Sequence, residues 1–151
     1  MLDDTDRRIL RNFQAEPSLS ISELAGRVGL TATTCARRLD KMEAAGVLLG
    51  QEEVVDWLAL GYSVEVSLRV TLDKAETRAT DDFIERARDI PEVLEIQTFL
   101  GRVDVRLSVI ARDLEHYQAL YRDRILTLPH IADIEALMRI ATVKDATALP
   151  V

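Results

Sequence analysis

Residues 20–31 read SISELAGRVGLT, and this short stretch decides the fold of the first third of the chain. Ser20 and Glu23 have the spacing of a capping box, in which the serine side chain caps a helix and the glutamate bonds back to it. Gly29 follows where that helix must end, because glycine adopts a positive φ without steric cost. The stretch therefore predicts a short helix over residues 21–28 and a tight turn after it.

A further helix is expected to begin after Thr31, which can serve as its N-cap, and to stop at Gly46. Cys35, Leu39 and Met42 recur at helical spacing and define an inward stripe. The opposite side carries hydroxyl and basic groups. Two helices joined at a glycine, the second with such an outer face, form the helix-turn-helix pattern that binds double-stranded DNA. The residues expected to contact DNA are Thr31, Thr33, Thr34, Arg37, Arg38 and Lys41.

These side chains have different expected roles. Arg37 and Lys41 can reach base edges or phosphates in the major groove, and the threonines can donate to either. Arg38 lies one step round the helix and is expected to meet a phosphate or to form a salt bridge with Asp40 or Glu43. The N-terminal region holds seven basic and seven acidic residues, so a single copy would neutralise few phosphates and bind weakly. Dimerisation is therefore expected, with half-sites about one helical turn apart.

The remainder of the chain predicts an α+β domain. Residues 63–72 alternate apolar and polar side chains, as in a strand with one buried face. The expected elements are a strand over 63–72, a helix over 80–89, strands over 93–100 and 103–110, a helix over 113–128 and a strand over 131–143. This order is the split βαβ, or βαββαβ, arrangement of ferredoxin-like domains.

The boundary between the two regions is expected after Gly46. Residues 47–55 fit either a short strand or an extended linker, and residues 56–61 fit a turn. The expected organisation is a winged-type helix-turn-helix domain over 1–50 that opens with a helix over 2–13, a hinge over 51–61 and a ferredoxin-like domain over 62–151.

One face of the predicted sheet must pack on the two helices, and the other must be solvated or covered by a partner. Alternate residues of the first strand, such as Val66 and Val70, are apolar enough to favour a partner. The pattern therefore predicts self-association through the sheet.

Composition narrows the function further. The net charge of −7 argues against a protein that coats itself with nucleic acid. Cys35 is the single cysteine and lies on the inward stripe, and His116 and His130 are isolated, so no metal site, cofactor or catalytic residue is expected. No stretch has the apolar length of a bilayer span, and the first residues lack the features of a secretion signal. We therefore expect a soluble cytoplasmic protein with no membrane partner.

Over nearly its whole length, the chain resembles the Lrp/AsnC family of transcription regulators, which includes the leucine-responsive regulatory protein. In the first domain the matching segments are Leu2-Asp3, Asp6-Arg7, Ile9-Leu10, Glu23-Leu24-Ala25, Val28-Gly29-Leu30-Thr31, Arg38-Leu39 and Gly46-Val47. In the second they are Pro91-Glu92-Val93, Gly101 with Asp104, Leu128-Pro129 and Val143-Lys144. Their shared order and spacing make the resemblance more specific than any one motif.

The resemblance implies a sequence-specific DNA-binding regulator that forms homodimers, commonly assembled into tetramers, octamers or larger rings. It also implies that the C-terminal domain binds an amino-acid effector between subunits. A glycine lets a backbone amide approach a small ligand, while Asp104 could pair with an α-amino group and Arg102 with a carboxylate. The family usually has an aromatic residue where this chain has Val105. The expected effector residues are Gly101, Arg102, Val103 and Asp104.

Two alternatives remain. Siroheme decarboxylases look similar overall but carry histidine- and tryptophan-rich motifs in the second domain, whereas this chain has only Trp57 and two scattered histidines. The other alternative is a co-assembly module that modulates a relative without binding DNA. The complete helix-turn-helix with its basic face argues against such a module.

Overall fold

The computed structural model describes residues 2–146 and 148–151, and the chain divides into two compact units. The first unit comprises Met1–Val54 together with Val143–Val151, and the second comprises Val55–Thr142. No helix in the described part of the chain is long and apolar enough to cross a membrane.

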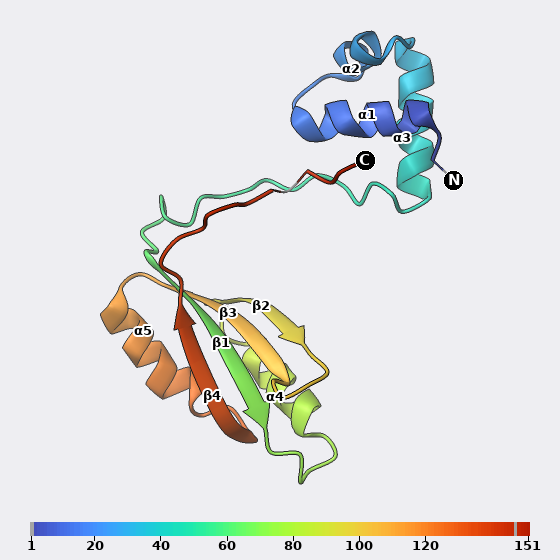
Figure 1. The fold of residues 1–151 in the computed structure, drawn as a ribbon. Helices are drawn as coiled ribbons and strands as arrows, with labels where there is room; N and C mark the ends of the chain where they lie inside the picture. Colours follow the sequence, from blue (N-terminus) through green and yellow to red (C-terminus); the bar gives the residue numbers. More distant parts are fainter. Residues whose placement is uncertain (1, 147) are drawn as a thin grey trace. The chain divides into compact units, whose positions relative to one another are not determined.

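Three helices form most of the first unit: α1 (Asp4–Ala15), α2 (Ile21–Val28) and α3 (Ala32–Ala44) (Figure 1). A side chain caps the start of each helix. The capping hydrogen bonds run from the Asp6 amide to Asp3 Oδ1 (2.8 Å), from the Glu23 amide to Ser20 Oγ (3.3 Å) and from the Thr34 amide to Thr31 Oγ1 (3.2 Å). The predicted helices are confirmed, with α1 spanning Asp4–Ala15 instead of residues 2–13.

The apolar stripes of these helices meet in one small core. Cys35 is fully buried, Met42 is almost fully buried and Leu39 packs beside them, so the predicted inward stripe of α3 is confirmed. Burial raises the pKa of the Cys35 thiol, which disfavours the reactive thiolate. The buried core residues are Ile9, Leu10, Leu24, Ala25, Val28, Cys35 and Met42.

The end of the chain returns to this helical unit. The Leu149 amide donates to Gln14 Oε1 at 2.6 Å, and Gln14 Nε2 donates to the Leu149 carbonyl at 3.3 Å. Val151 packs against the core of the three helices. Residues distant in sequence therefore complete the first unit.

The second unit is an α+β fold in which two helical segments cover one face of an antiparallel sheet. Its elements are β1 (Val64–Leu72), α4 (Ala79–Ala87), β2 (Val93–Thr98), β3 (Val105–Ala111), α5 (Leu114–Leu120), the π-helical turn η1 (Tyr121–Ile125) and β4 (Ile131–Met138). The strand order is β2-β3-β1-β4, with β1 and β3 at the centre (Figure 1). The predicted ferredoxin-like order of strands and helices is confirmed.

Most predicted elements of the second unit agree with the observed ones to within two residues at each end, and two differ more. The strand predicted over 131–143 ends at Met138, because its partner β1 begins at Val64 and supplies few groups beyond that point. The single helix predicted over 113–128 begins as α5 and continues as η1, in which the Leu126 amide bonds to the Tyr121 carbonyl at 2.9 Å. Residues 47–55 are extended chain without strand pairing, so the linker alternative holds there.

The sequence pattern predicts that Val66 and Val70 lie on the open face of the sheet, where they favour a partner, but both lie on the face that the helices cover. Val66 and Val70 are 1% and 0% exposed, because they pack towards α4 and α5. The other face of β1 carries Glu65, Ser67 and Arg69, whose neighbours on β3 are Ile110, Ser108 and Arg106. The open face is therefore largely polar and charged.

Candidate DNA interface and effector cavity

The turn between α2 and α3 has the geometry that a helix-turn-helix needs. Gly29 adopts a left-handed conformation with φ of 69°, and the Leu30 amide then bonds to the Ala25 carbonyl at 2.9 Å. This arrangement satisfies carbonyls at the end of α2 and turns the chain within two residues. Thr31 then caps α3, so the first turn of α3 is fixed at its start.

The outer face of α3 carries most of the predicted DNA-contacting residues. Thr31, Thr33, Arg37 and Lys41 are exposed, whereas Thr34 is half-buried and accepts a hydrogen bond from the Thr31 hydroxyl at 2.9 Å. Arg37 and Lys41 form no ion pair within the described residues. Their charges are therefore available to a nucleic-acid ligand.

Arg38 differs from its neighbour Arg37. Its guanidinium bonds to Asp3 Oδ2 at 2.8 Å and to Asp6 Oδ1 at 2.7 Å, so the predicted salt bridge to Asp40 or Glu43 is wrong. These contacts tie α3 to the start of α1, and the hydrogen bond from Arg38 is the main cause that lowers the pKa of Asp3. The Arg38 Nε atom is buried without a partner among the described atoms. Helical spacing cannot show this pairing, because the two carboxylates come from another helix.

In the second unit, the predicted effector residues lie between β2 and β3. Gly101 has φ of 150° and is exposed, as is Arg102, while Val103 is half-buried. The Arg102 carbonyl accepts a hydrogen bond from Thr71 Oγ1 at 2.9 Å, which fixes the loop to β1. Asp104 is 7% exposed and so is not a surface turn residue.

Asp104 is held by groups that are distant in sequence. Its Oδ2 accepts the Leu72 amide at 2.9 Å, and its Oδ1 pairs with Lys74 Nζ at 2.7 Å. The hydrogen bond from Lys74, followed by that from Leu72, lowers the pKa of Asp104. The carboxylate is therefore charged near neutral pH. Lys74 lies in the segment between β1 and α4, and no local sequence signal pointed to it.

Lys74 and Asp104 line a cavity of about 380 Å³. Its walls combine one cation, one anion, two hydroxyl groups and an apolar side, which matches the chemistry of an amino-acid zwitterion with a small side chain. A free amino acid would have to compete for the contact that Lys74 and Asp104 make with each other. The lining residues are Lys74, Thr80, Thr98, Phe99, Leu100, Gly101 and Asp104.

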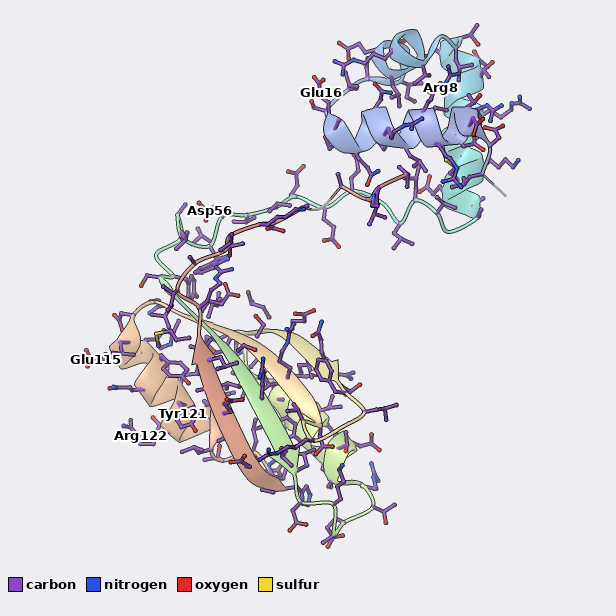
Figure 2. All side chains as sticks on the ribbon, viewed as in Figure 1. Arg8, Glu16, Asp56, Glu115, Tyr121 and Arg122 are labelled. Carbon is purple, nitrogen blue, oxygen red and sulfur yellow. The ribbon has the colours of Figure 1, made fainter. Side chains whose placement is uncertain are left out.

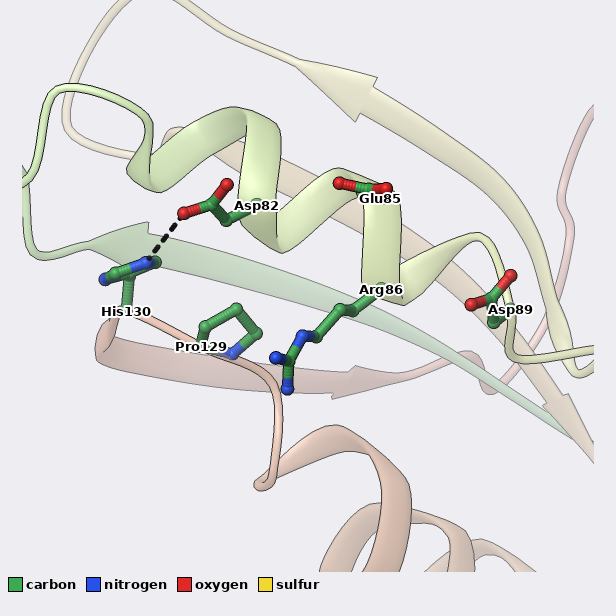
Figure 3. A pocket seen from close by; sticks show the side chains of 6 residues that line it. All are labelled: Asp82, Glu85, Arg86, Asp89, Pro129 and His130. Atoms are coloured by element: carbon green, nitrogen blue, oxygen red, sulfur yellow. Dashed lines mark hydrogen bonds and ion pairs between the residues drawn. The ribbon is translucent and has the colours of Figure 1, made fainter.

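A second hollow lies against α4, away from this loop (Figure 3). Asp82 of α4 faces His130, whose Nε2 is 3.4 Å from Asp82 Oδ2. His130 has φ of 65°, and its carbonyl accepts the Asp73 amide at 2.7 Å, so its backbone has a structural role. Within residues 2–146 and 148–151, no three or more His, Cys, Asp or Glu side chains form a group that could hold a metal ion.

Comparison with protein families matches both units. Residues 65–149 match the Lrp/AsnC ligand binding domain, and residues 2–48 match a winged helix-turn-helix DNA-binding domain. The chain is 28% identical to the transcriptional regulator AzlB of Bacillus subtilis, over all of this chain and 96% of that protein. It is 33% identical to the proline dehydrogenase transcriptional activator of Rhodobacter capsulatus, over 87% of this chain and 86% of that protein.

Solved structures agree with these matches. A transcriptional regulator from Neisseria meningitidis in complex with L-Met has a TM-score of 0.89 and 28% identity, covering 99% of this chain and 97% of that one. An AsnC family regulator from Agrobacterium tumefaciens has a TM-score of 0.86 and 32% identity, with the same coverage. The relatives are named as regulators, which favours a regulator over the decarboxylase alternative. The chain therefore belongs to the Lrp/AsnC family and is a DNA-binding transcription regulator with an amino-acid ligand-binding domain.

Proposed function

We propose that this regulator reads DNA through the exposed face of α3 and responds to an amino acid held beside the loop between β2 and β3. The observation that carries the DNA-contacting role is that Arg37 and Lys41 are exposed and form no ion pair with any residue that the structure describes. Thr31, Thr33 and Thr34 lie on the same helix start and would contribute hydroxyl groups to phosphates or bases. Arg38 would chiefly hold α3 against α1 through its ion pairs with Asp3 and Asp6. Any contact that it makes with a phosphate would be secondary.

The direct test of DNA binding uses the full chain and the DNA upstream of its own gene. Binding is measured by mobility shift at two salt concentrations, with unrelated DNA as the control. We expect specific complexes whose affinity falls as salt rises, because phosphate contacts release counterions. Equal affinity for both DNAs would contradict the sequence-specific role.

The effector proposal rests on the cavity that Lys74 and Asp104 share. Asp104 would receive the α-amino group and Lys74 the α-carboxylate, while Phe99 and Leu100 would contact the side chain. Gly101 would let the backbone approach the ligand, and Arg102 and Val103 would form the outer side of the loop. The relative solved with L-Met supports an amino acid as the ligand class.

The effector test repeats the DNA titration with each amino acid added singly. Asp104→Asn and Lys74→Gln are expected to abolish any change in DNA affinity that an amino acid causes. Asp133→Asn is a matched control, because Asp133 is an exposed carboxylate on β4 outside the cavity. A response that persists unchanged in Asp104→Asn would remove this residue from the effector site.

We also propose that the protein acts in the cytoplasm as a homodimer or a higher oligomer, such as a tetramer or octamer. One helix-turn-helix offers few cations, so paired modules are needed for tight binding. The open sheet face would supply the interface, because it carries charges of both signs, as in the pairs Arg69–Glu135 and Arg139–Glu65. Sedimentation should show a dimer or a larger species. Leu137→Asp, on this face, should weaken the association, whereas the control Leu126→Asp, which follows η1, should not.

A further inference from the structure

The chain passes between its two compact units twice. It leaves the first unit after Val54 and returns to it at Val143, so the second unit, Val55–Thr142, is connected at both of its ends. A unit on a single flexible linker can rotate about the bonds of that linker. Two connections close a loop through both units, and this loop removes part of the rotational freedom as long as the returning segment stays attached.

The returning segment, residues 143–151, is attached to α1. The Leu149 amide donates to Gln14 Oε1 at 2.6 Å, and Gln14 Nε2 donates to the Leu149 carbonyl at 3.3 Å. Val151 packs against the apolar core of the three helices. Both hydrogen bonds use the backbone of Leu149, whose side chain is 68% exposed. The attachment therefore depends on Gln14 and Val151 and not on the Leu149 side chain.

Within the second unit, the two connections are joined at their bases. The guanidinium carbon of Arg139 lies 5.5 Å from the centre of the Trp57 ring, within the range of a cation–π interaction. The Arg139 amide also donates to the Glu65 carbonyl at 2.9 Å, and its guanidinium pairs with the Glu65 carboxylate. The segment that enters the second unit is therefore held against the segment that leaves it.

Between their fixed points the two connections have nearly the same length. The first runs from Leu48, which packs on the helical core, to Trp57, and the second runs from Arg139 to Leu149. Each spans about ten residues, which is at most about 35 Å of extended chain. Val143, near the middle of the second connection, is 98% exposed. Connections of matched length limit the same range of motion, whereas one much longer connection would add little restraint.

We propose that residues 143–151 act as a reversible second tether, which couples the helical unit to the second unit. While Gln14 and Val151 hold this segment, a change in the second unit acts on the helical unit through both connections. When the segment detaches, residues 47–55 alone join the two units, and the helical unit reorients independently. The restraint does not depend on the proposed effector site, whereas its use in passing an amino-acid signal to α3 rests on that proposal.

Time-resolved fluorescence anisotropy of the full chain tests the tether. A dye is attached through Arg11→Cys, on the exposed side of α1, because Cys35 is fully buried and does not compete for it. In this parent chain we expect the dye to follow the tumbling of the whole protein. In Gln14→Ala/Val151→Ala a faster decay component should appear. Leu149→Ala is the matched control, because it keeps the backbone groups that bond to Gln14, and its decay should equal that of the parent.

A chain that lacks residues 148–151 is a second variant, in which all three helices keep their own sequence. It should show the same faster component, and circular dichroism of both variants checks that the helices are folded. Decays identical to the parent in both variants would overturn the tether. A faster component of equal amplitude in Leu149→Ala would overturn the attachment through Gln14 and Val151.

DNA titrations separate this proposal from the proposed function. We expect Gln14→Ala/Val151→Ala to keep specific DNA binding and to lose the change in affinity that an amino acid causes. A full amino-acid response in this variant would show that the signal does not pass through the segment. If the parent chain shows no amino-acid response, the effector proposal fails, while the anisotropy decays still decide whether the tether exists.

Discussion

The outer face of α3 and the loop between β2 and β3 present charged groups in opposite ways. On α3, Arg37 and Lys41 are exposed and unpaired within the described residues, so their charges stay hydrated and carry little desolvation free energy. In the loop, Asp104 is buried and already paired with Lys74. We expect that a group of the first kind can be removed without disturbing the fold, whereas a group of the second kind supports both the fold and the proposed ligand site.

The largest effect is expected on DNA affinity. Arg37→Ala/Lys41→Ala should weaken specific binding by about 100-fold and reduce its salt dependence, because two charge-assisted contacts are lost. The thermal midpoint should stay at the wild-type value. Fluorescence anisotropy with labelled DNA measures the change, and Arg122→Ala is a matched control on the exposed side of η1 (Figure 2). Wild-type affinity in the double variant would exclude this face of α3 from the interface.

The next effect concerns stability and its dependence on pH. Asp104→Asn should lower the free energy of unfolding by about 2 kcal/mol at pH 7, because a buried charge-assisted contact is weakened. Lys74 and the Leu72 amide lower the pKa of Asp104 in the folded state. The stabilisation is therefore complete above the unfolded pKa, about 4, and is lost as pH falls through the lower folded value.

Urea titrations of both proteins from pH 7 to pH 3 measure this difference. The gap between wild type and Asp104→Asn should narrow towards acid, while the gap for Asp133→Asn should stay small throughout. A gap that does not change with pH would show that the charge of Asp104 is not the source of its stabilising effect.

A smaller effect on stability is expected when Arg38 is replaced, and this effect distinguishes Arg38 from its neighbour Arg37. Arg38→Ala should lower the thermal midpoint, because Asp6 is buried and loses its ion-pair partner. Arg37→Ala should leave the midpoint unchanged. Calorimetric melting of the two variants checks the comparison, and equal midpoints would mean that the contacts of Arg38 with α1 contribute nothing to stability.

The smallest effect is expected at the chain end. Gln14→Ala removes the two hydrogen bonds to Leu149 and should destabilise the helical unit by about 1 kcal/mol or less, because both groups can bond to water instead. Amide exchange at Leu149 should quicken, while exchange in β1 stays the same. Unchanged exchange at Leu149 would indicate that Val151 alone anchors the segment.

Sequence patterns predicted most of the fold because its signals are local. The capping box at Ser20 and Glu23, the positive φ of Gly29 and the alternation along β1 each depend on residues a few positions apart. Element ends were less certain, since the end of β4 at Met138 depends on where its partner strand begins. The π-helical turn at Tyr121–Ile125 likewise had no signal in the sequence.

The sequence by itself determined the helix-turn-helix, the order of strands and helices, and the family. Tertiary structure alone decided which charges are free: Arg38 is held by Asp3 and Asp6, and Asp104 by Lys74. It also decided that Val66 and Val70 face the helices and that the open face is polar. The physical reason is that periodicity fixes the side of an element on which a residue lies, whereas an ion pair depends on which distant segment packs against that side.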